Sequence, residues 1–370
     1  MDFDFSDEQA QLREAVSRWV AKAYTFERRR TIVAGGGLDR TALAELAELG
    51  LTALTVPETQ GGLGMGAVEV MVVLEQLGKG MVIEPLGQQL VSAGVLTHAG
   101  DALQSQWLPR MASGEALVTL AHQERGARYR LDRCATVATP AANGWRLSGA
   151  KHIVLGGDRA DGWIVPANTA DGLALFLVAA DAQGVRASGY LTQDGSRAGD
   201  LLLDQAHAAL ITHQGQAVLQ EAMDALVACA CAEGVGLMDA TLAITADYLN
   251  TRQQFGVPIA SFQALRHRVA DMKMQLELAR SMSYYATLKL GAPAAERSLA
   301  VSRAKVQLGQ SLRFVGQQAV QLHGGIGVTD EYIVSHCFKK LTQLEMTAGD
   351  TLHHLGQVSD GLQDSAGVFA

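Results

Sequence analysis

The segment from Gln321 to Asp350, QLHGGIGVTDEYIVSHCFKKLTQLEMTAGD, ends one long helix, passes through a glycine pair and begins a second helix. Apolar residues between Val301 and Leu322 repeat at spacings of three and four, which is the period of one helical face. Gly324 and Gly325 follow directly, and glycine is the residue that most often ends a helix. The segment therefore predicts two helices that pack through apolar faces.

Two further helices are predicted just before this segment. Apolar residues between Phe262 and Ala279 repeat at the same helical spacing, and Pro293 separates this stripe from the next one. The stretch from Gln216 to Asn250 is almost uniformly apolar, which favours a helix buried on most sides. Together these patterns predict an antiparallel helical bundle over residues 209–370.

The middle of the chain has the pattern of a small β domain, predicted over residues 118–208. Short β-prone runs such as WRLSG, HIVLG, GWIVPA and LALFLVAA alternate there with Gly, Asp and Asn turns. No helical pattern separates these runs, so an antiparallel sheet is favoured over βαβ units. No G-x-G-x-x-G follows a strand, so a Rossmann dinucleotide site is not indicated.

Residues 1–117 are predicted to form an N-terminal helical domain. Ser6 and Gln9 have the spacing of a capping box, and a short helix after Asp39 is predicted to end at Gly50. The glycines of VPETQGGLGMG, from Val56 to Gly66, are too dense for a helix interior, so this segment is interpreted as a loop. The expected fold class is therefore mainly α, with a β domain in the middle.

Composition excludes several classes of protein. Apolar residues make up 48% of the chain and charged residues 18%, which is the balance of a globular protein with ample core. The net charge of -8 argues against a nucleic-acid surface. The acidic start, MDFDFSDEQ, is unlike a signal peptide, and we expect no apolar run that spans a membrane.

Cysteine usage predicts the compartment. A chain with only four cysteines at this length is not a disulfide scaffold, so we expect a reducing, cytoplasmic environment. Cys229 and Cys231 have a spacing that can bind a metal, but no second pair of ligands accompanies them, so no metal site is predicted.

Four markers appear in a fixed order and together resemble the acyl-CoA dehydrogenase family. They are VPETQGGLGMG, WLPRMASGE, the RQQFG segment that ends at Gln263, and QLHGGIGVTDEY. The resemblance covers nearly the whole chain. It implies a FAD cofactor, an acyl-CoA substrate, an electron-transfer acceptor and a tetramer in which FAD contacts cross a subunit interface.

The resemblance assigns cofactor contacts to three residues at the end of the buried helix. Arg252 matches an arginine that binds the FAD diphosphate of a neighbouring subunit, and a guanidinium suits phosphate well. The alternative is an arginine that satisfies the last helix carbonyls. Phe255 would pack against a ring of FAD and Gln263 would read an adenine edge. Otherwise they are a core phenylalanine and a surface glutamine.

A second set of contacts is assigned to the loop that opened this section. By resemblance, Gln321, Gly324 and Gly325 hold the adenosine end of FAD. Glycine permits a close approach of the backbone to a ligand. The alternative is an ordinary glycine cap at the end of the helix.

The chain departs from the family where the flavin ring would sit. AHQERG, from Ala121 to Gly126, and KHIVLGG, from Lys151 to Gly157, occupy the places of the flavin loop and the ring-contacting strand. The hydroxyl residue that the family often places near flavin N5 is Leu155 here, which cannot donate a hydrogen bond. A complete flavin seat within this chain is therefore not expected.

The second departure concerns the catalytic base. The family uses a Glu to remove the proton α to the thioester, and its position falls on Ala348. An alternative family position falls near Leu226, which also lacks a carboxylate. Glu345 and Asp224 lie near these two places and are candidates for a displaced base, although both also fit ordinary polar positions. His353 and His354 are expected at a solvated helix end.

The chain retains the family residues that contact FAD across a subunit interface, but it lacks the catalytic Glu. The hypothesis is therefore that this chain forms half of an active site. A Glu-bearing paralogue would complete it in a heterotetramer. The substrate by analogy is an acyl-CoA with a dicarboxylic or steroid-derived acyl group, in lipid or steroid catabolism. Two alternatives stay open: a self-sufficient homomeric dehydrogenase with a displaced base, and a non-catalytic flavin or acyl-CoA binding module.

Overall fold

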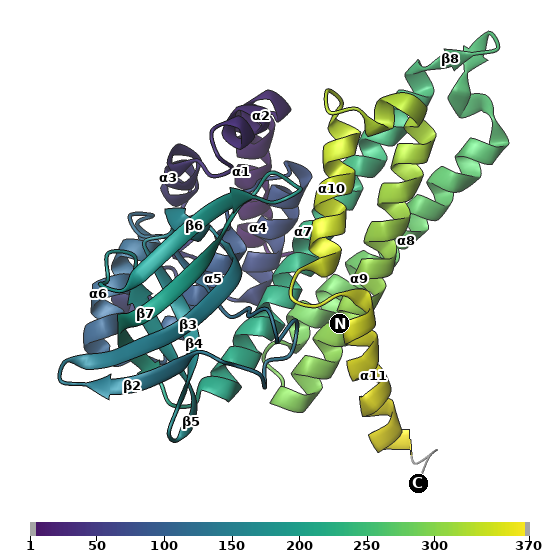
Figure 1. Cartoon of the computed structure of the whole chain (residues 1–370). Helices are drawn as coiled ribbons and strands as arrows, with labels where there is room; N and C mark the ends of the chain where they lie inside the picture. The colour runs from purple at the N-terminus through teal and green to yellow at the C-terminus, as the bar shows by residue number, and fades with distance from the viewer. Residues whose placement is uncertain (1–4, 367–370) are drawn as a thin grey trace. The chain divides into compact units, whose positions relative to one another are not determined.

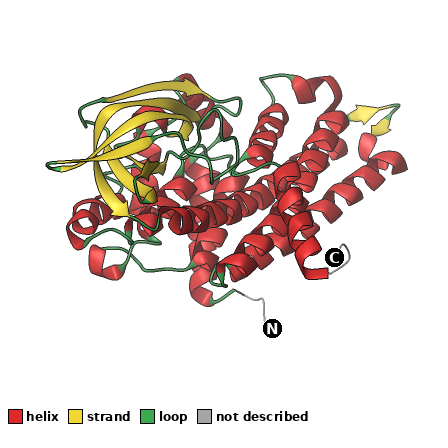
Figure 2. Cartoon of the chain, turned by 60° about the horizontal axis from the view of Figure 1, so that its bottom comes forward, coloured by secondary structure: helices red, strands yellow, loops and turns green. Residues whose placement is uncertain are grey.

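The computed structural model describes residues 5–366, in which helices precede and follow one large sheet along the chain (Figure 1, Figure 2). The helices are α1 (Asp7–Ala23), α2 (Phe26–Ala34), α3 (Arg40–Glu48), α4 (Ala67–Lys79), α5 (Leu86–Leu96), α6 (Asp101–Ala112), α7 (Gly215–Thr251), α8 (Gln263–Lys289), α9 (Ala294–His323), α10 (Ile333–Met346) and α11 (Thr351–Ala366). The predicted fold class, mainly α with a middle β domain, is confirmed.

Nine strands and five short 3-10 helices complete the described chain. The strands are β1 (Val118–Leu120), β2 (Val137–Ala141), β3 (Gly144–Leu155), β4 (Gly162–Thr169), β5 (Gly172–Ala179), β6 (Val185–Leu191), β7 (Arg197–Thr212), β8 (Gln253–Gln254) and β9 (Val257–Pro258). The 3-10 helices are η1 (Leu51–Ala53), η2 (Glu58–Gln60), η3 (Gly157–Arg159), η4 (Ile259–Ser261) and η5 (Gly324–Val328).

Helix ends follow the local signals in the sequence. Ser6 Oγ accepts a hydrogen bond from the backbone N–H of Gln9, and Gln9 Oε1 accepts one from the N–H of Ser6, so α1 begins at the predicted capping box. α9 ends at His323 because Gly324 takes φ +61, a conformation that glycine adopts without strain.

The large sheet has the order β1-β4-β2-β3-β7-β5, with β6 on β7 and a further β4–β5 pairing. Trp163 and Phe176 lie in its core. Most pairings are antiparallel, as predicted, but β4 pairs in parallel with both β1 and β2. The parallel register of β2 and β4 consists of one residue pair, Val137↔Asn168, and β3 lies between these two strands in the sequence.

By internal contacts the described chain divides into two compact units. One contains the segment that ends at Arg29, Met71–Val82 and the segment that begins at Val227; the other contains Arg30–Val70 and Ile83–Leu226. The three-domain division at residues 117 and 208 remains a prediction, and β7 continues beyond 208 to Thr212.

The first unit has a core formed by parts of four long helices. Val235 of α7, Leu276 of α8, Leu308 of α9 and Leu341 of α10 are all fully buried in it. Leu276 and Leu308 belong to the apolar stripes that predicted the bundle, and Val235 lies in the uniformly apolar stretch predicted to be buried.

By length and composition α7 could cross a membrane, which the sequence analysis did not expect. The helix has 37 residues, and 61% of its most apolar window is buried inside the protein. The core helix of a soluble protein passes the same test, so this is weak evidence for a membrane span.

Candidate active site

A short hairpin of β8 and β9 follows α7 and extends past the end of the neighbouring helices (Figure 1). Phe255 lies at its tip with φ +55, and 92% of the residue is exposed. Its ring touches the edge of Phe262, with the ring centroids 6.1 Å apart. Phe255 is therefore not a core residue, and its ring is accessible to another molecule.

Arg252 and Gln263 lie at the two ends of this hairpin, and both are exposed. Within residues 5–366, the structure records no hydrogen bond or ion pair from the Arg252 guanidinium. Thr251 Oγ1 instead donates to the carbonyls of Asp247 and Tyr248 at the end of α7. The carbonyl-capping alternative for Arg252 therefore has no support, and the guanidinium is available to an anion.

The second predicted contact is the segment 324–330, which we call the glycine loop. A Cβ added to Gly324 or Gly325 would meet no atom within 4 Å. Gly324 needs its left-handed φ, but Gly325 has neither a positive φ nor a crowded surrounding. Nothing inside the described chain requires glycine at 325, which indicates room for an external group.

The glycine loop is anchored where it leaves α9. The rings of Tyr248 and His323 stack with centroids 4.3 Å apart, and Tyr248 Oη donates to the His323 carbonyl at 3.3 Å. The backbone N–H of Arg252 donates to the carbonyl of the same Tyr248. The last turn of α7 therefore connects the hairpin to the glycine loop, and the two predicted sets of cofactor contacts lie together.

Ala348 lies in a tight turn of residues 347–350, which we call the Ala348 turn. Ala348 has φ +56 and Gly349 has φ +113, so the turn holds a non-glycine residue in the left-handed region. The Ala348 turn follows α10, whereas the glycine loop precedes it. At 1.5 Å per residue, the 14 residues of α10 separate them by about 20 Å.

Lys305 of α9 is fully buried beneath the Ala348 turn. Its Nζ donates to the carbonyls of Leu344, Glu345 and Gly349 at 2.9, 2.7 and 2.9 Å. Burial lowers the pKa of Lys305 to about 8, so the ammonium remains the main form at neutral pH. All three of its protons are engaged, and Lys305 therefore fixes the turn.

His354 supports the turn from the other side. Its Nε2 lies 3.0 Å from the Ala348 carbonyl and its Nδ1 lies 3.1 Å from Ser302 Oγ. Burial, and then the charge of Lys305, lower the pKa of His354 to about 3, so the ring is neutral. The expected solvated position of His354 was wrong, because tertiary partners on α9 and in the turn bury it.

Neither candidate for a displaced base is a free carboxylate. Glu345 Oε1 accepts hydrogen bonds from the N–H and hydroxyl of Thr351 at 3.0 and 2.6 Å, and pairs with Arg313 at 3.2 Å. These contacts cap the start of α11. Asp224 is buried and accepts a hydrogen bond from Gln220 at 3.0 Å. Both residues are held in structural contacts.

In the β domain, a buried ion pair supports the strand that carries Leu155. Lys151 Nζ lies 2.6 Å from Glu124 Oε1. Burial acts to raise the pKa of Glu124, but hydrogen bonds from Lys151 and Thr136 outweigh it and lower that pKa to about 2. Ile153 has φ +53 and is 56% exposed, an unusual conformation for a β-branched residue.

The fit to FAD is therefore uneven. A free guanidinium, an exposed ring and an open glycine loop suit the phosphate and adenosine end. Leu155 offers no hydrogen bond to a flavin ring, and the half-buried His122 beside this region has a pKa lowered to about 4 by burial and by Lys151. Position 155 therefore does not fit the hydroxyl role that the resemblance implies beside the flavin ring.

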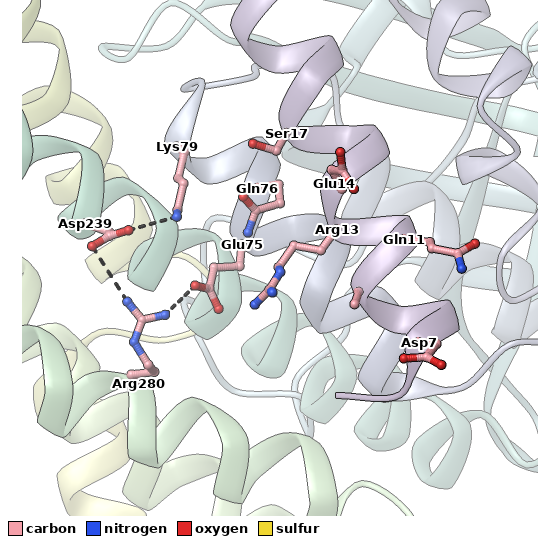
Figure 3. A pocket seen from close by; sticks show the side chains of 11 residues that line it. Asp7, Gln11, Arg13, Glu14, Ser17, Glu75, Gln76, Lys79, Asp239 and Arg280 are labelled. Carbon is pink, nitrogen blue, oxygen red and sulfur yellow. Dashed lines mark hydrogen bonds and ion pairs between the residues drawn. The ribbon is translucent and has the colours of Figure 1, made fainter. Parts of the chain in front are cut away.

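A pocket of about 640 Å³ lies between α1, α4, α7 and α8 (Figure 3). Arg280 pairs there with Glu75, and Lys79 pairs with Asp239 at 2.8 Å. These cations are neutralised within the pocket, and none of the predicted site residues lines it. The pocket is separate from the predicted cofactor contacts.

The four cysteines are free, and burial is the main cause that raises the pKa of each thiol. The value reaches about 12 for Cys229 and Cys231 and about 11 for Cys337. Within the described residues, no group of three His, Cys, Asp or Glu could hold a metal ion.

Sequence reasoning missed the network around Lys305. A signal was present, because Lys305 lies four residues after Val301 and three before Leu308, on the apolar stripe of α9. A charged residue on a buried face is rarely accidental and needs partners.

The chain matches two family models. Residues 213–363 match the acyl-CoA dehydrogenase C-terminal domain and residues 6–115 match the N-terminal domain. It is 29% identical to acyl-CoA dehydrogenase FadE27 of Mycobacterium tuberculosis over 88% of this chain and 89% of that protein.

Solved structures give the same relationship. A chain of the Tcur3481–Tcur3483 steroid ACAD variant is 31% identical, with a TM-score of 0.90 over 98% of this chain and 99% of that chain. A chain of the ChsE4–ChsE5 complex from Mycobacterium tuberculosis is 28% identical, with a TM-score of 0.90 over 99% of this chain and 100% of that chain.

Proposed function

Because the chain belongs to the acyl-CoA dehydrogenase family, we propose that it is a FAD-dependent dehydrogenase subunit that works with a Glu-bearing partner chain. The reaction is the α,β-dehydrogenation of an acyl-CoA thioester. The partner supplies the base and the contacts to the flavin ring. This chain supplies the contacts to the other end of the cofactor.

FAD is the cofactor, and when bound it accepts the hydride from the β carbon. On this chain Arg252 would bind the diphosphate, while Phe255 and Gln263 would contact a ring and an adenine edge. Gln321 with Gly324 and Gly325 would hold the adenosine end. The exposure of these residues supports such a role, because a site completed by another subunit is open in a single chain.

One observation carries the proposal of a partner: position 348, where the resemblance places the base, offers no proton acceptor. The side chain of Ala348 is a methyl group. The carbonyls of Gly349 and Ala348 are engaged by Lys305 and His354. The two neighbouring carboxylates are held in structural contacts. Asp350 Oδ1 accepts a hydrogen bond from the backbone N–H of His353, and Glu345 binds Thr351 and Arg313. A base therefore has to come from elsewhere.

The alternatives are less well supported. A homomeric enzyme with a displaced base would need Glu345 or Asp224 to leave its hydrogen bonds, with a loss of stability. A non-catalytic binding module would keep Arg252 and the glycine loop but has no need for a partner with a Glu. The similarity to chains of two-component proteins supports the heteromeric assembly over both.

The proposed substrate is an acyl-CoA with a steroid-derived acyl group. This rests on the similarity to a protein described as a steroid ACAD, at 31% identity. The assembly is proposed to be a heterotetramer that passes its electrons to an electron-transfer acceptor protein.

The test is expression of this chain alone and together with a paralogue that carries the Glu. Alone, the chain should purify without stoichiometric FAD and show no dehydrogenase activity. Together, the two chains should co-purify with FAD, and a steroid-derived acyl-CoA should bleach the flavin absorbance. A yellow homomer of this chain that is bleached by an acyl-CoA would refute the need for a partner.

A control separates loss of the base from loss of the flavin seat. Ala348→Glu returns a carboxylate to the turn, but Leu155 remains, so the variant alone should stay inactive. Activity in this variant without a partner would show that the flavin seat of this chain is intact and would contradict the proposed division of roles.

A further inference from the structure

The far end of the glycine loop is anchored by a histidine that a buried arginine orients. Arg29, near the middle of α2, is 1% exposed. Its Nε donates to the carbonyl of Met81 at 3.1 Å, and its Nη1 lies 3.3 Å from Nδ1 of His336 on α10. A guanidinium is always protonated and only donates, so His336 Nδ1 is the acceptor and carries no proton.

This contact determines the tautomer of His336. A neutral imidazole has one N–H, which must then lie on Nε2. Nε2 lies 2.8 Å from the carbonyl of Asp330, so it donates to the last residue of the glycine loop. Phe26 of α2 packs its ring edge against the imidazole at a centroid distance of 5.1 Å. His336 therefore connects α2 to the loop.

We propose that His336 is a positioning residue for the glycine loop, held by Arg29 in the neutral tautomer that donates to Asp330. Together with Tyr248 at the other end, it fixes both ends of a loop in which Gly324 and Gly325 face open space. The role of this loop in holding FAD rests on the function proposed above; its positioning by His336 does not.

The same geometry makes the loop sensitive to pH. The charged groups that face His336 are Arg29 from α2, Asp330 from the loop and Lys339 from α10 itself. A second proton on the imidazole would go to Nδ1, which faces the guanidinium. Burial lowers the pKa of His336, and Arg29 adds to this against the hydrogen bond to Asp330.

The sign of the effect follows from the lowered pKa. A histidine that is neutral in the ordered loop stabilises it at neutral pH, and this stabilisation is lost as the pH falls below the usual range of histidine. Acid should therefore loosen residues 324–330 before the rest of the bundle. The neutral ring also keeps Arg29, and with it the turn at Met81, in place.

Hydrogen–deuterium exchange on the full chain tests the proposal without any cofactor. The loop amides should exchange about tenfold faster in His336→Ala than in the wild-type chain at neutral pH, because one hydrogen bond to the loop is lost. His336→Gln keeps an N–H donor but cannot be protonated. It should restore most of the protection and abolish its dependence on pH. His98→Gln, at an exposed histidine, is the matched control.

Two results would overturn the positioning role. One is unchanged loop exchange in His336→Ala; the other is a His336→Gln chain whose loop still opens in acid like the wild type. FAD retention by the co-expressed assembly is then measured for the same variants. Faster loop exchange with unchanged FAD retention supports the positioning role and refutes the proposed use of the loop for FAD.

Discussion

The glycine loop and the Ala348 turn lie at opposite ends of α10 and are built in opposite ways. The glycine loop is fixed at its ends by Tyr248 and His336, and its Gly324 and Gly325 face open space. In the Ala348 turn, the carbonyls of Gly349 and Ala348 are engaged by Lys305 and His354, and the side chain at position 348 is only a methyl group. The open positions of the glycine loop can contact another molecule, whereas the internal hydrogen bonds of the Ala348 turn stabilise the fold.

The glycine loop is proposed to bind the cofactor, whereas the Ala348 turn lacks the side chain that would act on the substrate. The residues that would hold FAD are exposed and have few internal contacts, so selection for stability alone does not explain them. The position where the resemblance places the base belongs to a turn that is held by internal hydrogen bonds. We therefore expect changes in the Ala348 turn to alter stability, and changes in the hairpin or glycine loop to alter FAD binding.

The largest effect is expected for Lys305→Met. Removal of the ammonium takes three hydrogen bonds from carbonyls in a buried site, so the free energy of unfolding should fall by roughly 2–4 kcal/mol. Denaturant unfolding measures this change. Lys273→Met, at a lysine that is 55% exposed and paired only with Glu277, should change it by less than about 0.5 kcal/mol. Equal effects of the two variants would contradict the structural role of Lys305.

Arg252→Ala should act on the cofactor and not on the fold. The loss of a charge-assisted contact to the diphosphate should weaken FAD binding by the co-expressed assembly about 10- to 100-fold. FAD retention during gel filtration and titration of the apo-assembly measure this. The melting temperature of the isolated chain should not change, and unaltered FAD retention would refute the assigned role.

A pair of glycine substitutions compares the two regions directly. Gly349→Ala places a Cβ 2.5 Å from His354 Nε2 at φ +113, so unfolding free energy should fall by about 1–3 kcal/mol. In Gly325→Ala the Cβ meets no atom within 4 Å, so the fold should be unchanged within about 0.5 kcal/mol. FAD retention should show the reverse order. If both variants affected only stability, the glycine loop would have no external partner.

The smallest expected effect is an increase in the free energy of unfolding. Ala348→Gly relieves a left-handed alanine, and after the entropy cost of glycine it should stabilise the chain by about 0.5 kcal/mol. Thermal unfolding of the two proteins side by side detects this difference. A clear loss of stability would show that the methyl group packs against the bundle core more than it strains the backbone.

Local signals in the sequence predicted the helices and several of their ends. The apolar spacing from Val301 to Leu322 and the glycine that follows place the end of α9 correctly at His323. The capping box at Ser6 is likewise formed. Helix ends and capping boxes depend on residues within one or two helical turns, so they can be predicted from the local sequence alone.

What the sequence could not predict depends on partners far along the chain. His354 is buried because Ser302 and the Ala348 carbonyl meet it, and neither neighbour is visible from the local pattern. The parallel pairing of β4 with β1 and β2 is also non-local. The open surroundings of Gly325, and the anchoring of its loop by Arg29, likewise required the structure.

Cys231 and Cys337 are buried and Cys134 and Cys229 are half-buried, and the raised pKa of each thiol slows its reaction with thiol reagents at neutral pH. The thiolate is the reactive form, and a raised pKa keeps Cys134, Cys229, Cys231 and Cys337 protonated. A cysteine introduced at Val328, which is 71% exposed in the glycine loop, would thus be labelled faster than the native thiols. A fluorophore there would report the arrival of a cofactor or a second subunit in real time, in the unaltered background of the protein.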